Sequence, residues 1–197
     1  NTTKTNKVGF IGGVEGPVIG RFQAGFEKGV ADAGKKLGKD IQITSTYAGT
    51  FADASKGRAL ASSMYQAGAD IIYHAAATTG QGIFQEAKAL NETGSKDKVW
   101  VIGVDRDQNE DGKYTTKDGK DDNLTLASTI KGVNIAVKKI SDLALEDKFP
   151  GGEHLTYGLK DGGVDLTTEA LSDQAKTAVK EAKEQIISGD VKVPDQP

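Results

Sequence analysis

The chain has 197 residues, no cysteine, and a formal net charge of −3 from 25 basic and 28 acidic residues. This length supports one good hydrophobic core, so we expect one domain with an appendage. The balanced charge argues against nucleic acid as a partner, and the lack of cysteine excludes disulfides, thiolate catalysis and cysteine-based metal sites.

Four apolar runs recur at a near-constant interval, and each ends in small or polar residues. They are Lys7–Gly13, Ile41–Gly49, Asp70–Ala77 and Val99–Asp105. Between them lie helix-length segments with apolar residues three and four positions apart, beginning with Pro17–Lys36. This alternation predicts an α/β fold, with a parallel sheet connected by crossover helices.

Two of the connections carry signals for where their helices start. Asp53 stands where an N-cap belongs, ahead of the second helix. After the third run, the glycines of Thr78–Gly82 predict a turn, followed by a helix from Ile83 to Leu90.

The second half of the chain is less regular. The polar segment Arg106–Asn123 is predicted to be one long surface insertion before the apolar run Leu124–Ile130. A helix is predicted over Val133–Phe149, because Pro150 and two glycines follow it.

In the tail we predict a strand at Leu155–Leu159, extended structure at Val164–Leu166 and a helix over Thr168–Ser188. The polar start, Asn1–Asn6, stands directly before a buried-type strand and predicts that the natural chain extends further upstream.

Ligands of open α/β sheets bind beyond the carboxyl ends of the strands, which makes three residues candidates. Phe51 is placed to stack on a planar ring, or else it closes the top of the core. Asp105 can accept two hydroxyls, or else it braces its loop. Lys131 can donate to the same hydroxyls and pair with Asp105, or else it is solvated.

The polar segment also contains a partial calcium motif. Its candidate ligands are Asp107, Asn109, Asp111 and Asp118. The twelfth position of such a loop should be a bidentate glutamate, and paired helices should flank it. We therefore favour a solvated acidic loop and expect no metal site.

No nucleophile and base pair emerges from the sequence. His74 and His154 are expected to be structural, and the glycines near Gly12 and Gly80 complete neither a dinucleotide fingerprint nor a phosphate loop. We expect no enzymatic activity and no cofactor.

Several motifs occur together in one order. They are Val8–Gly13, Arg21–Phe26, Tyr47–Asp53, Gly80–Gly82 and Ile102–Asp105. In this order they resemble the basic membrane protein family of bacterial lipoproteins, the nucleoside-binding components of ABC importers. The similarity runs from about Lys7 to Pro194, so it covers nearly the whole chain.

The resemblance implies one lobe of a type I periplasmic binding protein plus a carboxyl-terminal tail, without most of the amino-terminal lobe. It implies that Phe51 stacks on a purine or pyrimidine base while Asp105 and Lys131 hold the ribose hydroxyls. The turn of Thr79, Gly80 and Gln81 would line the same wall. An ABC permease is the implied partner, and the implied location is extracytoplasmic, with a lipid anchor to the cell membrane in the full-length parent.

The resemblance also divides the chain. Residues 1–131 would form the ligand-binding lobe, 132–153 a helix crossing toward the missing lobe, and 154–197 the return strand and last helix. The crossing helix is then expected to expose an apolar stripe, to repack, or to drive self-association.

Two functions therefore stand side by side. The first is nucleoside binding for import. The alternative is the effector-binding domain of a sugar-responsive transcription regulator of the same architecture, which requires an upstream helix-turn-helix.

Overall fold

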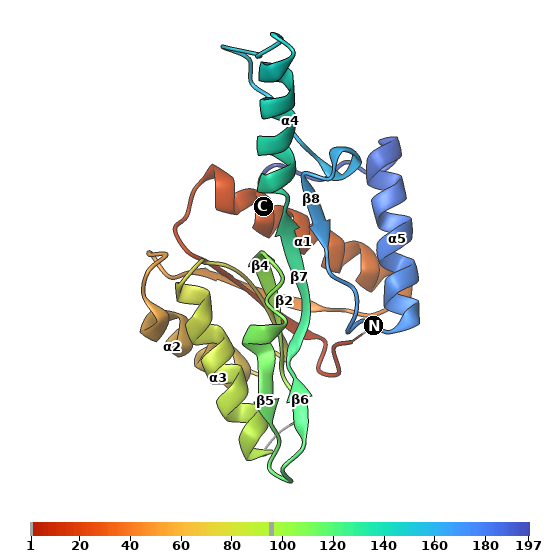
Figure 1. Ribbon diagram of the computed structural model, residues 1–197. Helices are drawn as coiled ribbons and strands as arrows, with labels where there is room; N and C mark the ends of the chain where they lie inside the picture. Colours follow the sequence, from red (N-terminus) through yellow and green to blue (C-terminus); the bar gives the residue numbers. More distant parts are fainter. Residues whose placement is uncertain (1, 95–96) are drawn as a thin grey trace.

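The computed structural model describes residues 2–94 and 97–197 (Figure 1). Six strands form one sheet in the order β2-β1-β3-β4-β7-β8. Five of them are parallel: β1 (Lys7–Gly12), β2 (Gln42–Tyr47), β3 (Ile71–Ala75), β4 (Trp100–Asp105) and β7 (Thr125–Lys131). The edge strand β8 (Val164–Leu166) runs antiparallel to β7. The predicted α/β fold with a parallel sheet is confirmed.

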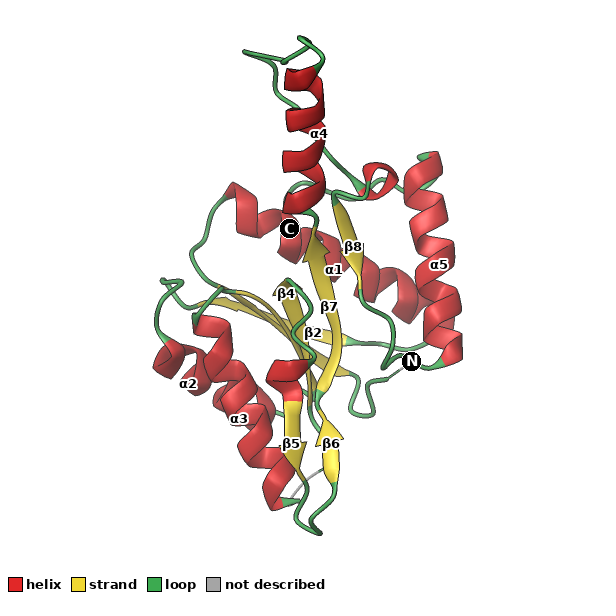
Figure 2. Cartoon of the chain, in the orientation of Figure 1, coloured by secondary structure: helices red, strands yellow, loops and turns green. Residues whose placement is uncertain are grey.

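Helices cover both faces of the sheet (Figure 2). The bounds are α1 (Pro17–Leu37), α2 (Ala54–Gln66), α3 (Thr79–Thr93) and α5 (Asp173–Ser188). Alternation along β1 separates the two cores, because Val8 and Phe10 pack with residues of α1, whereas Ile11 packs with residues of α2 and α3.

The start of α3 differs from the prediction. The helix begins at Thr79 rather than Ile83, so the predicted turn already belongs to its first turns. The glycines that indicated a turn are helical residues needed for close packing: a Cβ on Gly82 would lie 1.8 Å from the Ala54 carbonyl oxygen of α2. The predicted N-cap Asp53 is confirmed, since its side chain accepts a hydrogen bond from the Lys56 amide.

The segment predicted as one long surface insertion, Arg106–Asn123, is the crossover between β4 and β7. Parallel neighbours require such a return, and here a 3₁₀ turn (Glu110–Gly112) and the hairpin of β5 (Lys113–Thr115) and β6 (Asp121–Asn123) supply it in place of a helix. Tyr114, in β5, is 8% exposed and joins the core of α2 and α3. Most of the segment is exposed, as predicted, but it is a connection with a buried anchor that its polar composition concealed.

The tail also departs from the prediction. Leu155–Leu159 is not a strand; the chain is irregular there until a 3₁₀ turn at Leu159–Asp161. The last helix starts at Asp173 rather than Thr168, capped by the side chain of Ser172.

Helix α4 (Val133–Leu145) projects from the body of the molecule (Figure 1). It contains no buried residue, and Val137 and Leu145 are 60% and 86% exposed. Of the outcomes expected for this helix, the structure shows an exposed apolar stripe. Among the described residues, no helix is both long and apolar enough to cross a bilayer.

Candidate ligand-binding site

An ion pair stands where two neighbouring parallel strands end. Asp105 closes β4 and Lys131 closes β7, and the Lys131 Nζ lies 2.7 Å from the Asp105 Oδ1. Both side chains are about half exposed, at 50% for Lys131 and 49% for Asp105. The predicted proximity of these two residues is therefore present in the structure.

Asp105 has an unusual backbone. Its φ is +69°, and the Arg106 amide donates to the Val104 carbonyl across it, which makes Asp105 the centre of a γ-turn. A side chain in the left-handed region costs about 1 kcal/mol or more. Such conformations persist only where the surroundings hold them, and they cluster at binding and switch sites.

Phe51 lies at the same edge of the sheet, in the loop between β2 and α2. Its ring rests on Gly13 at the end of β1, where a Cβ would come within 2.2 Å of the ring. The side chain is 40% exposed, so it is not a closed core residue. Because β1 and β4 are two strands apart, about 10 Å separates their ends.

Thr79 holds the Phe51 loop by three hydrogen bonds. Its Oγ1 accepts from the Asp53 amide (3.0 Å) and donates to the Thr50 carbonyl (3.2 Å), and its amide donates to the Phe51 carbonyl (3.2 Å). Thr79 is completely buried, so its contribution is to fix the loop that carries the aromatic ring.

The other two predicted wall residues differ from each other. Gly80 is buried under the His74 ring, where a Cβ would lie 2.2 Å from His74 Cε1. Gln81 is exposed in the first turn of α3 and lines a small cavity of about 290 Å³ together with Asp105. Among these three, Gln81 offers a side chain to a ligand.

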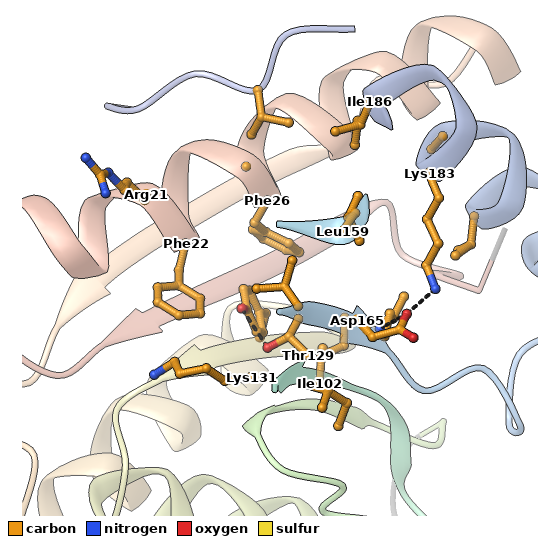
Figure 3. A pocket seen from close by; sticks show the side chains of 18 of the residues that line it. Arg21, Phe22, Phe26, Ile102, Thr129, Lys131, Leu159, Asp165, Lys183 and Ile186 are labelled. Atoms are coloured by element: carbon orange, nitrogen blue, oxygen red, sulfur yellow. Dashed lines mark hydrogen bonds and ion pairs between the residues drawn. The ribbon is translucent and has the colours of Figure 1, made fainter. Parts of the chain in front are cut away.

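A larger cavity of about 500 Å³ adjoins the ion pair on the α1 side of the sheet (Figure 3). Its wall is mainly apolar and comes from α1, the sheet, β8 and α5. The lining includes Phe22, Phe26, Tyr73, Ile102, Leu166, Val179 and Ile186. Lys131 lies beside Phe22, with its Nζ 5.8 Å from the ring centroid. Sequence reasoning missed this cavity, because an apolar helix stripe reads as ordinary core.

The partial calcium motif forms no cluster. The Asp107 carboxylate accepts from the Asn109 amide, Asp111 pairs with Arg106 at 2.7 Å, and the Asp118 carboxylate pairs with a lysine beyond the motif. Across residues 2–94 and 97–197, no group of three His, Asp or Glu side chains is arranged to hold a metal ion.

His74 is a core residue, as expected. It is fully buried, and its Nε2 lies 3.1 Å from Gln108 Oε1. The amide oxygen is an acceptor, so this nitrogen carries the proton. Burial, partly offset by the bond to Gln108, lowers the pKa of His74 from 6.5 to about 4.

This burial predicts an acid-sensitive fold. Between pH 6.5 and 4 the unfolded chain binds a proton at His74 that the folded chain excludes. The contribution of His74 to the free energy of unfolding is therefore fully present above pH 6.5 and falls as the pH drops toward 4. The loss approaches about 3 kcal/mol. Urea titrations from pH 7 to 4.5 measure it, and His74→Gln is the control that removes the titrating group. If the free energy of unfolding fell equally steeply with pH in both proteins, His74 would not be the group responsible.

The family follows from a match over the whole chain. Residues 1–197 fit the family model Bmp, described as PnrA-like ABC transporter substrate-binding protein. The chain belongs to the Bmp family. The resemblance drawn from its motifs is thereby confirmed.

Relatives of this Bmp chain are substantially longer. The chain is 50% identical to an ABC transporter nucleoside-binding protein, BmpA, of Lactococcus lactis, covering 98% of this chain and 54% of the relative. It is also 50% identical to a CD4+ T-cell-stimulating antigen of Listeria monocytogenes, covering 100% and 54%. The chain thus spans about half the length of these relatives.

A solved structure agrees with the fold. An ABC transporter solute-binding protein from Aeropyrum pernix K1 superposes with a TM-score of 0.79 at 26% identity. The alignment covers 95% of the Bmp chain and 58% of that protein. The observed architecture is therefore that of periplasmic binding proteins.

Proposed function

We propose that this Bmp chain is one lobe of a nucleoside-binding protein that delivers its ligand to an ABC importer. The observation that carries the proposal is the ion pair of Asp105 and Lys131 at the carboxyl edge of the sheet. A carboxylate and an ammonium held side by side offer acceptor and donor to two adjacent hydroxyls of a ribose. The name of the Lactococcus lactis relative supports a nucleoside as the ligand.

The base would lie on Phe51. Its ring is 40% exposed and rests on Gly13 at the end of β1. The ends of β1 and β4 are about 10 Å apart, a span comparable to a purine or pyrimidine nucleoside. Stacking of a base on an aromatic ring contributes about 1–3 kcal/mol. Gln81 lies in the first turn of α3, shares a small cavity with Asp105, and would supply a further polar contact.

One lobe alone provides only half of the contacts. Micromolar affinity corresponds to about −8 kcal/mol, and one stack with a few hydrogen bonds does not reach this after ordering costs. We therefore propose that a second lobe closes over the ligand by hinge bending, and that α4 crosses toward it. The permease partner, the extracytoplasmic location and the lipid anchor belong to this proposal.

Calorimetry with purine and pyrimidine nucleosides tests it. The 197-residue chain should bind at millimolar level or not at all, whereas the chain joined to the uncovered part of the Lactococcus lactis relative should bind about 100-fold tighter or more. Tight binding by the chain alone would contradict the half-site, and no binding by the joined protein would contradict the function.

Two aromatic variants decide which surface takes the base. Phe51→Ala in the joined protein is expected to weaken nucleoside binding by about 10- to 100-fold, the worth of one stack. Phe22→Ala, at the wall of the large cavity beside Lys131, is the matched control and should have little effect. The opposite order of effects would move the base into that cavity.

A further inference from the structure

We propose that Gln108 is a positioning residue that holds Asp105 in its left-handed conformation and so aims the carboxylate at the ribose beside Lys131. The inference rests on the proposed function for the ligand, but its structural part does not. Gln108 lies in the segment that the calcium motif drew attention to, three residues after Asp105, and it is 5% exposed.

The side chain of Gln108 reaches back under the γ-turn. Its Oε1 accepts from the Val104 amide at 2.9 Å, directly before Asp105. The carbonyl of Val104 accepts from the Arg106 amide, directly after Asp105. The backbone amide and the carbonyl of Val104 are therefore both hydrogen-bonded. Asp105, between Val104 and Arg106, forms the centre of the tight turn.

The same oxygen has a second buried partner. His74, on the neighbouring strand β3, lies with its Nε2 3.1 Å from Gln108 Oε1. Gly103 makes the room, because a Cβ there would lie 2.8 Å from this oxygen and 2.9 Å from the Ser128 hydroxyl. The strands on both sides of β4 thus shape a socket for this one side chain.

The backbone of Gln108 is anchored as well. Its amide donates to Ser128 Oγ, and its carbonyl accepts from Thr125 Oγ1, both at 3.0 Å and both on β7. Its Nε2 donates to Asp111 Oδ2 at 2.9 Å. Strand β7 also ends in Lys131. We call these hydrogen bonds of Gln108 to Val104 and to β7 the Gln108 clasp; they connect the backbone beside Asp105 to the strand that carries Lys131.

The clasp explains how a strained residue stays in place. A left-handed aspartate relaxes unless its neighbours over-determine its backbone. Here the neighbours are a buried amide and two adjoining strands rather than the half-exposed lysine. Gln108 touches no ligand in this scheme; it acts through Asp105.

The first test reads the backbone of Asp105 without ligand. In the full chain labelled with ¹⁵N and ¹³C, the Cα–Hα coupling and backbone shifts report the sign of φ. Gln108→Met keeps the length and removes both polar atoms, and it should shift Asp105 to negative φ. Asn109→Ala, in the same loop and outside the clasp, should leave it unchanged. An unaltered Asp105 signature in folded Gln108→Met would overturn the proposal.

A second variant guards against a failure to fold. Gln108→Asn is shorter by one methylene, so its oxygen falls short of the Val104 amide while the site stays polar. It should relax Asp105 in the same way as the methionine variant. A folded Gln108→Asn protein that retains positive φ at Asp105 also overturns the proposal.

The second test uses adenosine and 2′-deoxyadenosine with the chain joined to the uncovered part of the Lactococcus lactis relative. The parent should prefer the ribonucleoside by about 10- to 100-fold, and Gln108→Met should reduce this ratio toward one. A loss of stability alone would lower both affinities equally and leave the ratio, which would overturn the role. If the parent showed no preference for adenosine, that would instead count against the proposed function. The coupling measurement would still decide whether Gln108 holds Asp105 at positive φ.

Discussion

Replacing Asp105 with asparagine is expected to weaken nucleoside binding by about 100-fold or more. In the proposed pose the carboxylate accepts two ribose hydroxyls, and each charge-assisted hydrogen bond contributes about 1.5–3 kcal/mol. Asparagine tolerates the left-handed backbone at φ +69°, so the change removes charge without adding strain. Calorimetry on the joined protein measures the affinity.

The neighbouring carboxylate provides the control. Asp107 lies two residues further on, and its side chain accepts from the Asn109 amide instead of pairing with Lys131. Asp107→Asn should change the affinity by less than about threefold. A larger effect from Asp107 than from Asp105 would show that the wrong carboxylate has been assigned to the ribose.

The stability of the fold should hardly respond to the same replacement. Asp105 and Lys131 are each about half exposed, and such surface pairs contribute between 0 and about 1 kcal/mol. Unfolding of Asp105→Asn should therefore stay within about 1 kcal/mol of the parent. A binding defect without a stability defect is the signature of a residue placed for a ligand.

The sheet could be predicted because each buried strand has its own local run of apolar residues in the sequence. Val8 and Phe10 alternate with Gly9 and Ile11, and each set faces a different helical layer. The carboxyl edge follows from the parallel order alone, so Phe51, Asp105 and Lys131 could be assigned to one edge without coordinates. The ion pair at this edge is the tertiary contact that this reasoning anticipated.

The crossover from β4 to β7 could not be predicted in the same way. Its return path is polar and contains no α-helix, and its anchors are single residues, Tyr114 and Gln108, rather than a periodic stripe. A lone buried side chain has no sequence period to reveal it. The topology itself held the missing information, since two adjacent parallel strands require a connection that runs back along the sheet.

Thr79 shows a second limit of sequence reasoning. A threonine at a ligand edge looks like a contact residue, but its hydroxyl is fully used by the backbone of the Phe51 loop. Only the partners of a polar side chain separate a residue that touches a ligand from one that positions another residue. Those partners lie 26 and 29 positions away in the chain, beyond the reach of local pattern.

Gly82→Ala is expected to cause a large loss of stability for a single added methyl group. The new Cβ would lie 1.8 Å from the Ala54 carbonyl oxygen and 2.6 Å from the Arg58 nitrogen, both backbone atoms of α2. Neither can rotate away, so α2 and α3 must separate. Overpacking of this kind costs about 1–3 kcal/mol and sometimes more, which exceeds the gain of up to about 1 kcal/mol in helix propensity.

The consequence should reach the binding edge, because Ala54 is the first residue of α2 and follows the Phe51 loop directly. Thermal unfolding should shift down by about 2–8 °C, and nucleoside affinity in the joined protein should fall with it. Gly29→Ala is the matched control in α1: apart from its chain neighbours and the backbone of its own helix, no heavy atom lies within 4 Å of its added Cβ, so helix propensity alone should raise stability by about 0.5–1 kcal/mol. Equal effects at the two glycines would mean that α2 and α3 yield without cost, and the tight contact that supports the Phe51 loop would then have no energetic weight.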